Sequence, residues 1–261
     1  MPARFRAWDD YFIPGTTVLR NKFNEQDAAT LQLKEEQAAR LRLIELAANP
    51  VAGDFDYAHM KAIHGRIFQD VYEWAGQERV GPDSQMTKGG PDVVRFAPGD
   101  PAAPTIAYGY YPGPVVAEAA EEQYRRLASK DLLRGLPQAK FVVELAEIWG
   151  ELNVVHSFRE GNTRTQFVFF SQLAEQAGYR IDAAQFAVGQ PLRDEFVNAR
   201  FFSQATGSNE RLVDVLERAI SPIAPPSLEQ RIEAIVRREV YRKVNPAQDP
   251  GRTRQTKGYG R

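Results

Sequence analysis

The most constraining feature of this chain is a short polar loop between two apolar helical runs. Residues 141–155 carry apolar side chains at helical spacing, and a second helical pattern begins at about Asn162. Between the two runs lie residues 156–161, His-Ser-Phe-Arg-Glu-Gly. Packing two helices together does not require a base, an acid and a glycine in one loop. The sequence therefore predicts helices that meet at this loop, and the loop is a candidate site for chemistry.

The start of the second helix predicts an anion site. The first N–H groups of a helix point out of its N-terminus, where the macrodipole favours an anion. Gly161 lets the backbone approach a ligand closely or take a positive φ. Arg164 lies in the first turn, where its forked cation can bind a second phosphate group. The amides near Asn162 and Thr163 together with this arginine are typical of a phosphate site.

Two side chains of the loop add a base and a metal ligand. His156 ends the first helical run and faces the same loop, so it is a candidate general base. Glu160 is a hard oxygen ligand beside the expected phosphates, where Mg²⁺ is usually held. The alternative stays open at this point. Asn162 could be an ordinary helix N-cap, and Arg159, Glu160 and Arg164 could be a solvated charge cluster.

Residues 156–167, HSFREGNTRTQF, resemble the signature of Fic-domain proteins, His-x-Phe-x-(Asp/Glu)-Gly-Asn-(Gly/Lys)-Arg-x-x-Arg. The upstream runs at 53–64 and 68–76 look like a helix of the same family, so the resemblance covers about residues 25–220. It implies an all-α fold, the Fic helical bundle with a small β-hairpin flap. We expect this domain, with an N-terminal extension, at 1–225, and a C-terminal helix with a basic tail at 226–261.

The resemblance also implies an activity, the transfer of AMP from ATP to a Tyr, Thr or Ser hydroxyl of a target protein, with release of pyrophosphate. His156 would be the general base and Glu160 would hold Mg²⁺. Phe158 would be buried and would fix the loop to the core. The residues implied to bind the nucleotide phosphates are Gly161, Asn162, Thr163 and Arg164.

Two positions depart from the signature. Thr163 stands where the family has Gly or Lys; its amide remains, but a required positive φ would strain a β-branched residue. Phe167 replaces the last Arg, which in the family contacts the γ-phosphate. A nucleotide held by other groups, weak activity or a different phosphate donor are the alternatives. The second functional hypothesis is a catalytically weak module that binds a nucleotide or a partner. Phosphotransfer belongs to relatives with Lys at position 163, so Thr163 argues against it.

A hairpin is expected between the helices. Residues 86–88 and 93–97 could be two short strands joined by 89–92, although an irregular surface loop fits the pattern equally well. The resemblance favours the hairpin, because Fic proteins carry a flap here that pairs with the target through backbone hydrogen bonds. The target-binding residues expected on this flap are Lys88, Val94, Arg95 and Phe96.

The remaining pattern is helical. Helices are expected at 27–48, 56–75, 115–129, 138–155, 162–177, 192–202 and 209–220, followed by a linker at 220–226 and a last helix that begins at Ser227. His64 lies on the apolar face of its helix and is expected to be a core histidine, whereas His59 is expected at the surface.

Composition excludes several classes of function. The 261 residues carry a net charge of −1 and no cysteine, so neither nucleic-acid binding nor thiolate chemistry is indicated. We expect no signal peptide and no membrane span, and hence a cytoplasmic protein, or one translocated into a host cell. No convincing inhibitory Ser/Thr-x-x-x-Glu-Gly/Asn helix is found. Either a separate antitoxin chain restrains the protein or nothing does, as in the toxin of a two-chain pair or the head of a translocated effector.

Overall fold

The structure is a computed structural model that describes residues 5–224, and residues 5–222 form one compact unit. The helix expected after Ser227 and the basic tail lie outside the described residues. The expected domain boundary at 225/226 therefore stays a prediction. None of the helices within 5–224 combines the length and the apolar character that crossing a membrane requires.

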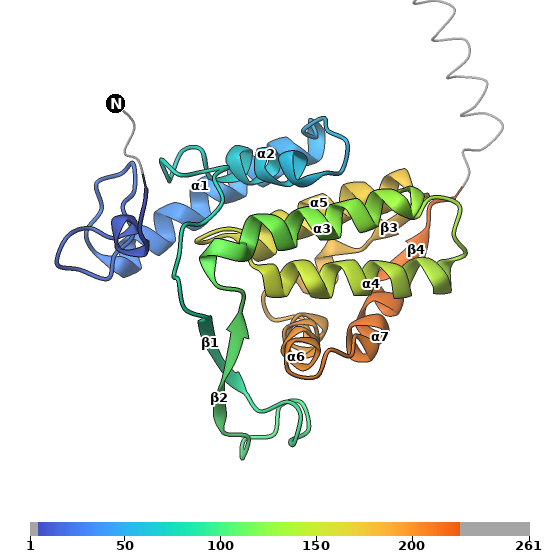
Figure 1. Cartoon of the computed structure of the whole chain (residues 1–261). Coiled ribbons are helices and arrows are strands. Elements are labelled where there is room, and N and C mark those ends of the chain that lie inside the picture. The colour runs from blue at the N-terminus through green and yellow to red at the C-terminus, as the bar shows by residue number, and fades with distance from the viewer. Residues whose placement is uncertain (1–4, 225–261) are drawn as a thin grey trace, which may run out of the picture. The chain divides into compact units, whose positions relative to one another are not determined.

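Helices dominate the described residues, which confirms the all-α expectation (Figure 1). α4 packs against α3, α5, α6 and α7, so the helix that leads into the polar loop lies in the core. Its apolar stripe explains this position, because Phe141, Leu145 and Ile148 are fully buried. The helices are α1 Ala28–Ala48, α2 Tyr57–Phe68, α3 Val116–Ser129, α4 Gln138–Val155, α5 Asn162–Gln176, α6 Pro191–Thr206 and α7 Glu210–Ala219.

The second helix ends earlier than its pattern predicted. The expected helix at 56–75 stops at Phe68, and the backbone amides of Val71 and Tyr72 both donate to the carbonyl oxygen of Phe68. The ring of Tyr72 stacks on Trp74 at 4.3 Å, and both rings are buried. The apolar residues Val71 and Trp74 are therefore buried as their spacing predicted, but they pack from a turn and not from the last turn of the helix.

The flap is a hairpin whose second strand differs from the expectation. β1 (Met86–Pro91) pairs antiparallel with β2 (Thr105–Tyr110). The expectation that Val94, Arg95 and Phe96 form a strand is wrong, because they lie in the connection between β1 and β2. The side chain of Asp92 accepts hydrogen bonds from the amides of Val94 (3.2 Å) and Arg95 (3.1 Å), which bends the chain into a turn.

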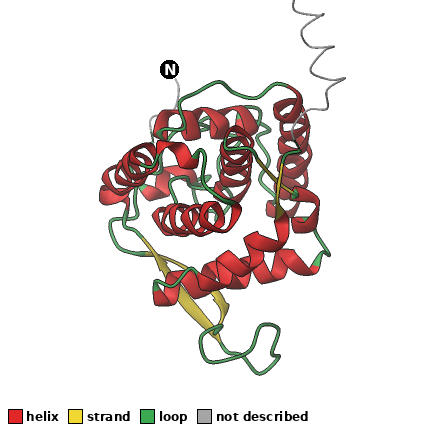
Figure 2. Cartoon of the chain, turned by 90° about the vertical axis from the view of Figure 1, so that its right-hand side faces the viewer, coloured by secondary structure: helices red, strands yellow, loops and turns green. Residues whose placement is uncertain are grey.

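Both views show the hairpin extending from the helices beside α6 (Figure 1; Figure 2). Its base is attached there, since Tyr108 stacks on Phe201 of α6 at 4.3 Å. A second small sheet joins β3 (Tyr179–Ile181) to β4 (Ile220–Pro222). The beginning of the expected linker at 220–226 is therefore a strand.

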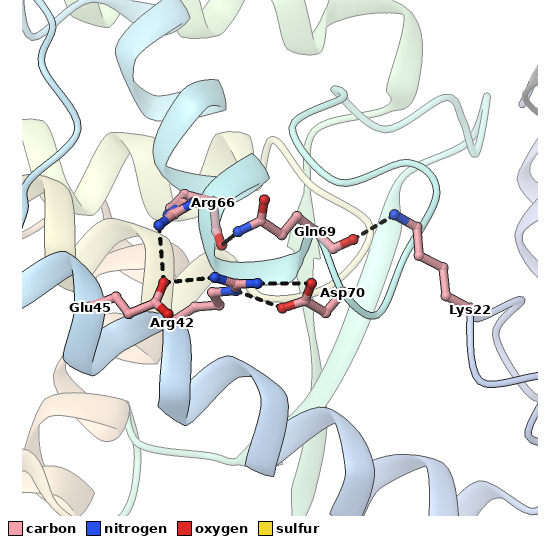
Figure 3. Close-up of polar contacts among 6 residues, drawn as sticks. All are labelled: Lys22, Arg42, Glu45, Arg66, Gln69 and Asp70. Carbon is pink, nitrogen blue, oxygen red and sulfur yellow. Dashed lines mark hydrogen bonds and ion pairs between the residues drawn. The ribbon is translucent and has the colours of Figure 1, made fainter.

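Ion pairs hold α1 against the end of α2 (Figure 3). Arg42 of α1 donates to both carboxylate oxygens of Asp70, at 2.6 and 3.0 Å. Glu45 of α1 accepts from Arg42 at 2.7 Å and from Arg66 at 3.0 Å. These side chains are 24 to 45% exposed, so the network contributes orientation more than stability. It matters because α1 also carries Glu35, whose carboxylate lies 2.7 Å from Arg164 in the first turn of α5.

Candidate active site

The polar loop turns sharply at both of its ends. His156 caps α4 in the left-handed conformation, at φ 51° and ψ 61°. Gly161 precedes α5 at φ 82°, and a Cβ there would collide with the ring of Phe68. Glycine is thus required for its backbone angle and for space. Thr163 lies inside α5 and is not among the residues with positive φ, so the strain considered for a β-branched side chain does not arise.

A buried histidine and an aromatic ring anchor the loop. Phe158 is buried as expected, and its ring stacks on His64 with centroids 3.9 Å apart. His64 accepts the Gly76 amide at Nδ1 (2.8 Å), and its Nε2 lies 3.1 Å from the carbonyl oxygen of Glu160. Burial lowers the pKa of His64 to about 3, so its ring stays neutral. The expectation of a core histidine is confirmed for His64, whereas His59 is buried and not at the surface as expected.

Asn162 fixes the loop with its side chain. Its Oδ1 accepts the Phe158 amide at 2.9 Å, and its Nδ2 donates to the Phe158 carbonyl oxygen at 2.7 Å. The side chain is buried and therefore turned away from any ligand. Its backbone amide, with that of Thr163, begins α5 and has no intrahelical acceptor. Gly161 differs, because its amide already donates to Glu160 Oε1 at 2.9 Å.

The sequence analysis missed Arg79, which holds the loop from outside. Its Nε donates to the carbonyl oxygen of His156 at 2.7 Å, and its Nη1 donates to that of Gly81 at 2.6 Å. The backbone amide of Arg79 donates to the carbonyl oxygen of Ser157 at 2.9 Å. The side chain is buried, and this burial lowers its pKa to about 10, so it remains charged at neutral pH. Nothing in the local sequence relates Arg79 to a loop 77 residues away.

The ring of His156 is set to accept a proton. Its Nδ1 lies 3.4 Å from the carbonyl oxygen of Asn153, and a proton on Nδ1 leaves Nε2 with a free lone pair. The ring packs on Tyr110 of β2 with centroids 4.2 Å apart. Burial, followed by the charges of Arg200 and Arg79, lowers the pKa of His156 to about 3. The imidazole is therefore neutral, as a general base must be.

A cleft of about 1230 Å³ runs along the loop. Its lining brings together five of the residues singled out in the sequence, His156, Glu160, Thr163, Arg164 and Lys88. Gly161 and Asn162, which were also singled out, are not among the residues that line it. Val94, Arg95 and Phe96 do not line it either, since they lie in the hairpin connection.

Arg164 already has a partner inside the protein. Its Nη1 lies 2.7 Å from Oε1 of Glu35, a buried acid on α1 that was missed in the sequence. Burial raises the pKa of Glu35, and the charge of Arg164 opposes that rise. Glu160 lies farther away, at 3.9 Å from Nη2. A phosphate group that binds Arg164 must share it with Glu35.

The residues fit a magnesium ion only together with a phosphate ligand. The described residues contain no group of three or more side chains placed to hold a metal. Glu160 supplies one exposed carboxylate beside the free amides of α5. Mg²⁺ is commonly bound by one or two carboxylates with substrate phosphates and water as its other ligands. A single acid next to a phosphate site is therefore sufficient.

Phe167 belongs to an aromatic cluster at the edge of the cleft. Its ring lies 5.0 Å from that of Trp149, 5.0 Å from Phe186 and 5.1 Å from Phe196. It is half-buried and lines the cleft. In this chain, the position of the last signature arginine is therefore occupied by a phenylalanine that packs against three aromatic rings.

Fold and site together define a helical protein with a candidate site for a phosphate-containing substrate at a helix N-terminus. The model of the Fic/DOC family matches residues 54–174. The probable protein adenylyltransferase y4lH of Sinorhizobium fredii is 35% identical over 184 residues, which cover 70% of this chain and 84% of y4lH. The chain belongs to the Fic/DOC family. It is also similar to the protein adenylyltransferase VbhT of Bartonella schoenbuchensis, at 36% identity over 174 residues, and spans 32% of VbhT.

Solved structures agree on the fold. The N-terminal Fic domain of a Bartonella effector protein (Bep) from Bartonella sp. AR 15-3 superimposes with a TM-score of 0.68 at 26% identity, covering 82% of this chain and 92% of that one. BepC of Bartonella tribocorum, determined with bound AMPPNP, gives a TM-score of 0.66 at 22% identity, covering 82% of this chain and 97% of that one.

Proposed function

We propose that this chain is a protein adenylyltransferase that transfers AMP from ATP to a Tyr, Thr or Ser hydroxyl of a target protein. The observation that carries the proposal is the position of His156, a neutral base that lines the same cleft as Thr163 in the first turn of α5. The names of the relatives, protein adenylyltransferase, support the same activity. An enzyme of this class is a nucleotidyltransferase.

The chemistry follows from this arrangement. His156 Nε2 takes the proton of the target hydroxyl, and the hydroxyl oxygen forms a bond to the α-phosphorus. The bond from that phosphorus to the oxygen bridging to the β-phosphate breaks, and pyrophosphate leaves. The amides of Asn162 and Thr163 donate to phosphate oxygens, and Arg164 binds a more distal phosphate. Mg²⁺ held by Glu160 would neutralise phosphate charge.

We place the target segment on the hairpin. β1 pairs with β2 on one side only, and its residues Thr87, Lys88 and Gly89 are exposed. A strand edge of this kind binds an extended segment through backbone hydrogen bonds. Lys88 also lines the cleft, so a segment paired with β1 would bring its hydroxyl toward His156. The remaining flap residues, Val94, Arg95 and Phe96, would contact the target from the hairpin connection and not from a strand.

Two further expectations belong to this proposal. Either a separate antitoxin chain would act as the inhibitor or the protein would be unrestrained, because the sequence shows no convincing inhibitory helix of its own. The place of action would be the cytoplasm, either of the producing cell or of a host cell into which the protein is translocated. Both rest on the resemblance to toxin and effector relatives.

One observation favours the second hypothesis, a catalytically weak module that binds a nucleotide or a partner. Phe167 gives the site an aromatic ring where the signature has a phosphate-binding arginine. Labelled ATP distinguishes the two functions when the purified chain is incubated with Mg²⁺ and a lysate. Adenine label on protein supports adenylyl transfer, and γ-phosphate label indicates phosphorylation. Label in neither form supports the binding module.

A further inference from the structure

Arg200 of α6 is a buried cation in the wall of the cleft. Its relative exposure is 9%, and it lines the cleft with Asn153 and Thr163. Its Nε donates to Asn153 Oδ1 at 2.8 Å, and Nη2 donates to the same oxygen. Its Nη1 donates to Thr163 Oγ1 at 3.1 Å. The guanidinium is therefore held in one orientation from two sides.

None of these partners carries a charge. Among residues 5–224, Arg200 has no carboxylate within ion-pair distance, whereas Arg164 has Glu35. Burial lowers the pKa of Arg200 to about 10, which leaves it charged at neutral pH. A buried charge without a counter-charge costs free energy, so it is rarely kept for packing alone. An anion in the cleft would supply the missing counter-charge.

The position of Arg200 indicates which anion. Asn153 holds two groups: its side chain orients Arg200, and its backbone carbonyl oxygen lies 3.4 Å from His156 Nδ1. Thr163, the other partner, belongs to the first turn of α5 and lines the cleft with His156. Arg200, His156 and the start of α5 thus converge on one place, where the transferred phosphoryl group would lie.

We propose that Arg200 binds the phosphate group next to His156 and gives the site, from α6, a second cation besides Arg164. The inference rests on the proposed function. Arg200 needs no rearrangement of the aromatic cluster around Phe167, because it reaches the site from another helix. The hydroxyl of Thr163 orients Nη1 of Arg200. Thr163, which stands where the signature has Gly or Lys, therefore also has a role in the site.

The test measures nucleotide binding by calorimetry in wild type and in Arg200→Gln, with thermal unfolding measured in parallel. The variant keeps a hydrogen-bond donor for Asn153 and removes the charge. We expect ATP and ADP to bind roughly ten- to hundredfold more weakly, as for the loss of a charge-assisted bond. We expect Tm to stay or rise, since an unpaired buried charge is removed. The matched control is Arg193→Gln, because Arg193 lies two turns earlier on α6 and is exposed at the same cleft. We expect this variant to bind ATP and ADP within about twofold of wild type.

A structural role would give the opposite result. If Arg200 only braces Asn153 and Thr163, the Arg200→Gln variant should have a lower Tm or fail to fold, and the protein that does fold should bind ATP like wild type. A lower Tm with wild-type affinity would overturn the inference, and so would a variant that does not fold. An equal loss of affinity in Arg193→Gln would show a general charge effect and would also overturn it. If wild type binds neither nucleotide, the proposed function is overturned together with the inference. If wild type binds ATP and Arg200→Gln binds it equally well, only the Arg200 inference fails.

Discussion

The loop at residues 156–161 and the hairpin at residues 86–110 face the same cleft, but they are held in different ways. Buried side chains from distant segments fix the loop, with Phe158 stacked on His64 and Arg79 bound to the loop backbone. The proposed general base, His156, is therefore positioned by contacts that come from outside the loop.

The hairpin is fixed at its base and free along β1. Tyr108 stacks on Phe201 of α6, and Gln204 donates to the carbonyl oxygen of Gly109. Beyond this base, β1 exposes most of its residues. The comparison teaches that the part proposed to do chemistry is rigid in its packing, and the part proposed to bind varied targets offers backbone groups and few fixed side chains.

The largest expected effect is on transfer in His156→Ala. Removing a general base should lower the transfer rate by roughly 10²–10⁴-fold. The fold should persist, because the ring is neutral and makes one long polar contact, to Asn153. Transfer of adenine label and thermal unfolding are measured together. A folded variant with wild-type transfer would remove His156 as the base.

Arg79→Met tests whether the loop depends on distant anchors more than the hairpin does. It leaves several buried carbonyl oxygens without a donor, so the free energy of unfolding should fall by about 3 kcal/mol. The matched control is Arg95→Met in the hairpin connection, whose side chain is 82% exposed. It should change stability by less than about 0.5 kcal/mol. Equal losses in urea unfolding would contradict the comparison.

Acid should destabilise the fold through the two neutral histidines of the site. His64 and His156 have pKa values lowered to about 3, against 6.5 for an exposed histidine. Between these values the unfolded chain binds protons that the folded chain does not, so stability falls as pH falls below 6.5. The loss is at most about 1.4 kcal/mol per histidine per pH unit. Urea unfolding between pH 7.5 and 5.5 measures it, and a flat profile would contradict neutral rings at His64 and His156.

The smallest expected effect concerns Glu35, which competes for Arg164. Glu35→Gln removes the charge that lies 2.7 Å from Arg164 and should tighten ATP several-fold, since one more cation is free for phosphate. Calorimetry compares it with Glu36→Gln, the next residue on α1, which is exposed. Unchanged or weaker ATP binding in Glu35→Gln would show that this ion pair does not restrain the site.

Features of the fold and the site that arise from neighbouring residues could be predicted from the sequence, whereas features that depend on distant residues could not. The helix α4, the loop and the start of α5 were predicted, because apolar periodicity and the signature are contiguous. The strand at 93–97 was wrong, because Asp92 bends the chain there while the β-branched and aromatic run at 105–110 supplies the partner of β1.

The missed site residues come from other helices or distant turns. Glu35, Arg79 and Arg200 carry no local signal that relates them to His156, since folding alone brings them to the loop. Asn153 did offer one, as an amide inside an apolar helical stripe, where a buried polar group requires a partner.

The most direct measurement of the central claim is a crystal structure with Mg²⁺ and a non-hydrolysable ATP analogue. The expected result is that the phosphates lie over the amides of Asn162 and Thr163, with the α-phosphorus facing His156 Nε2 and Glu160 on the metal. A nucleotide bound elsewhere in the cleft, with no phosphate at the start of α5, would contradict the claim that this loop is the site of transfer.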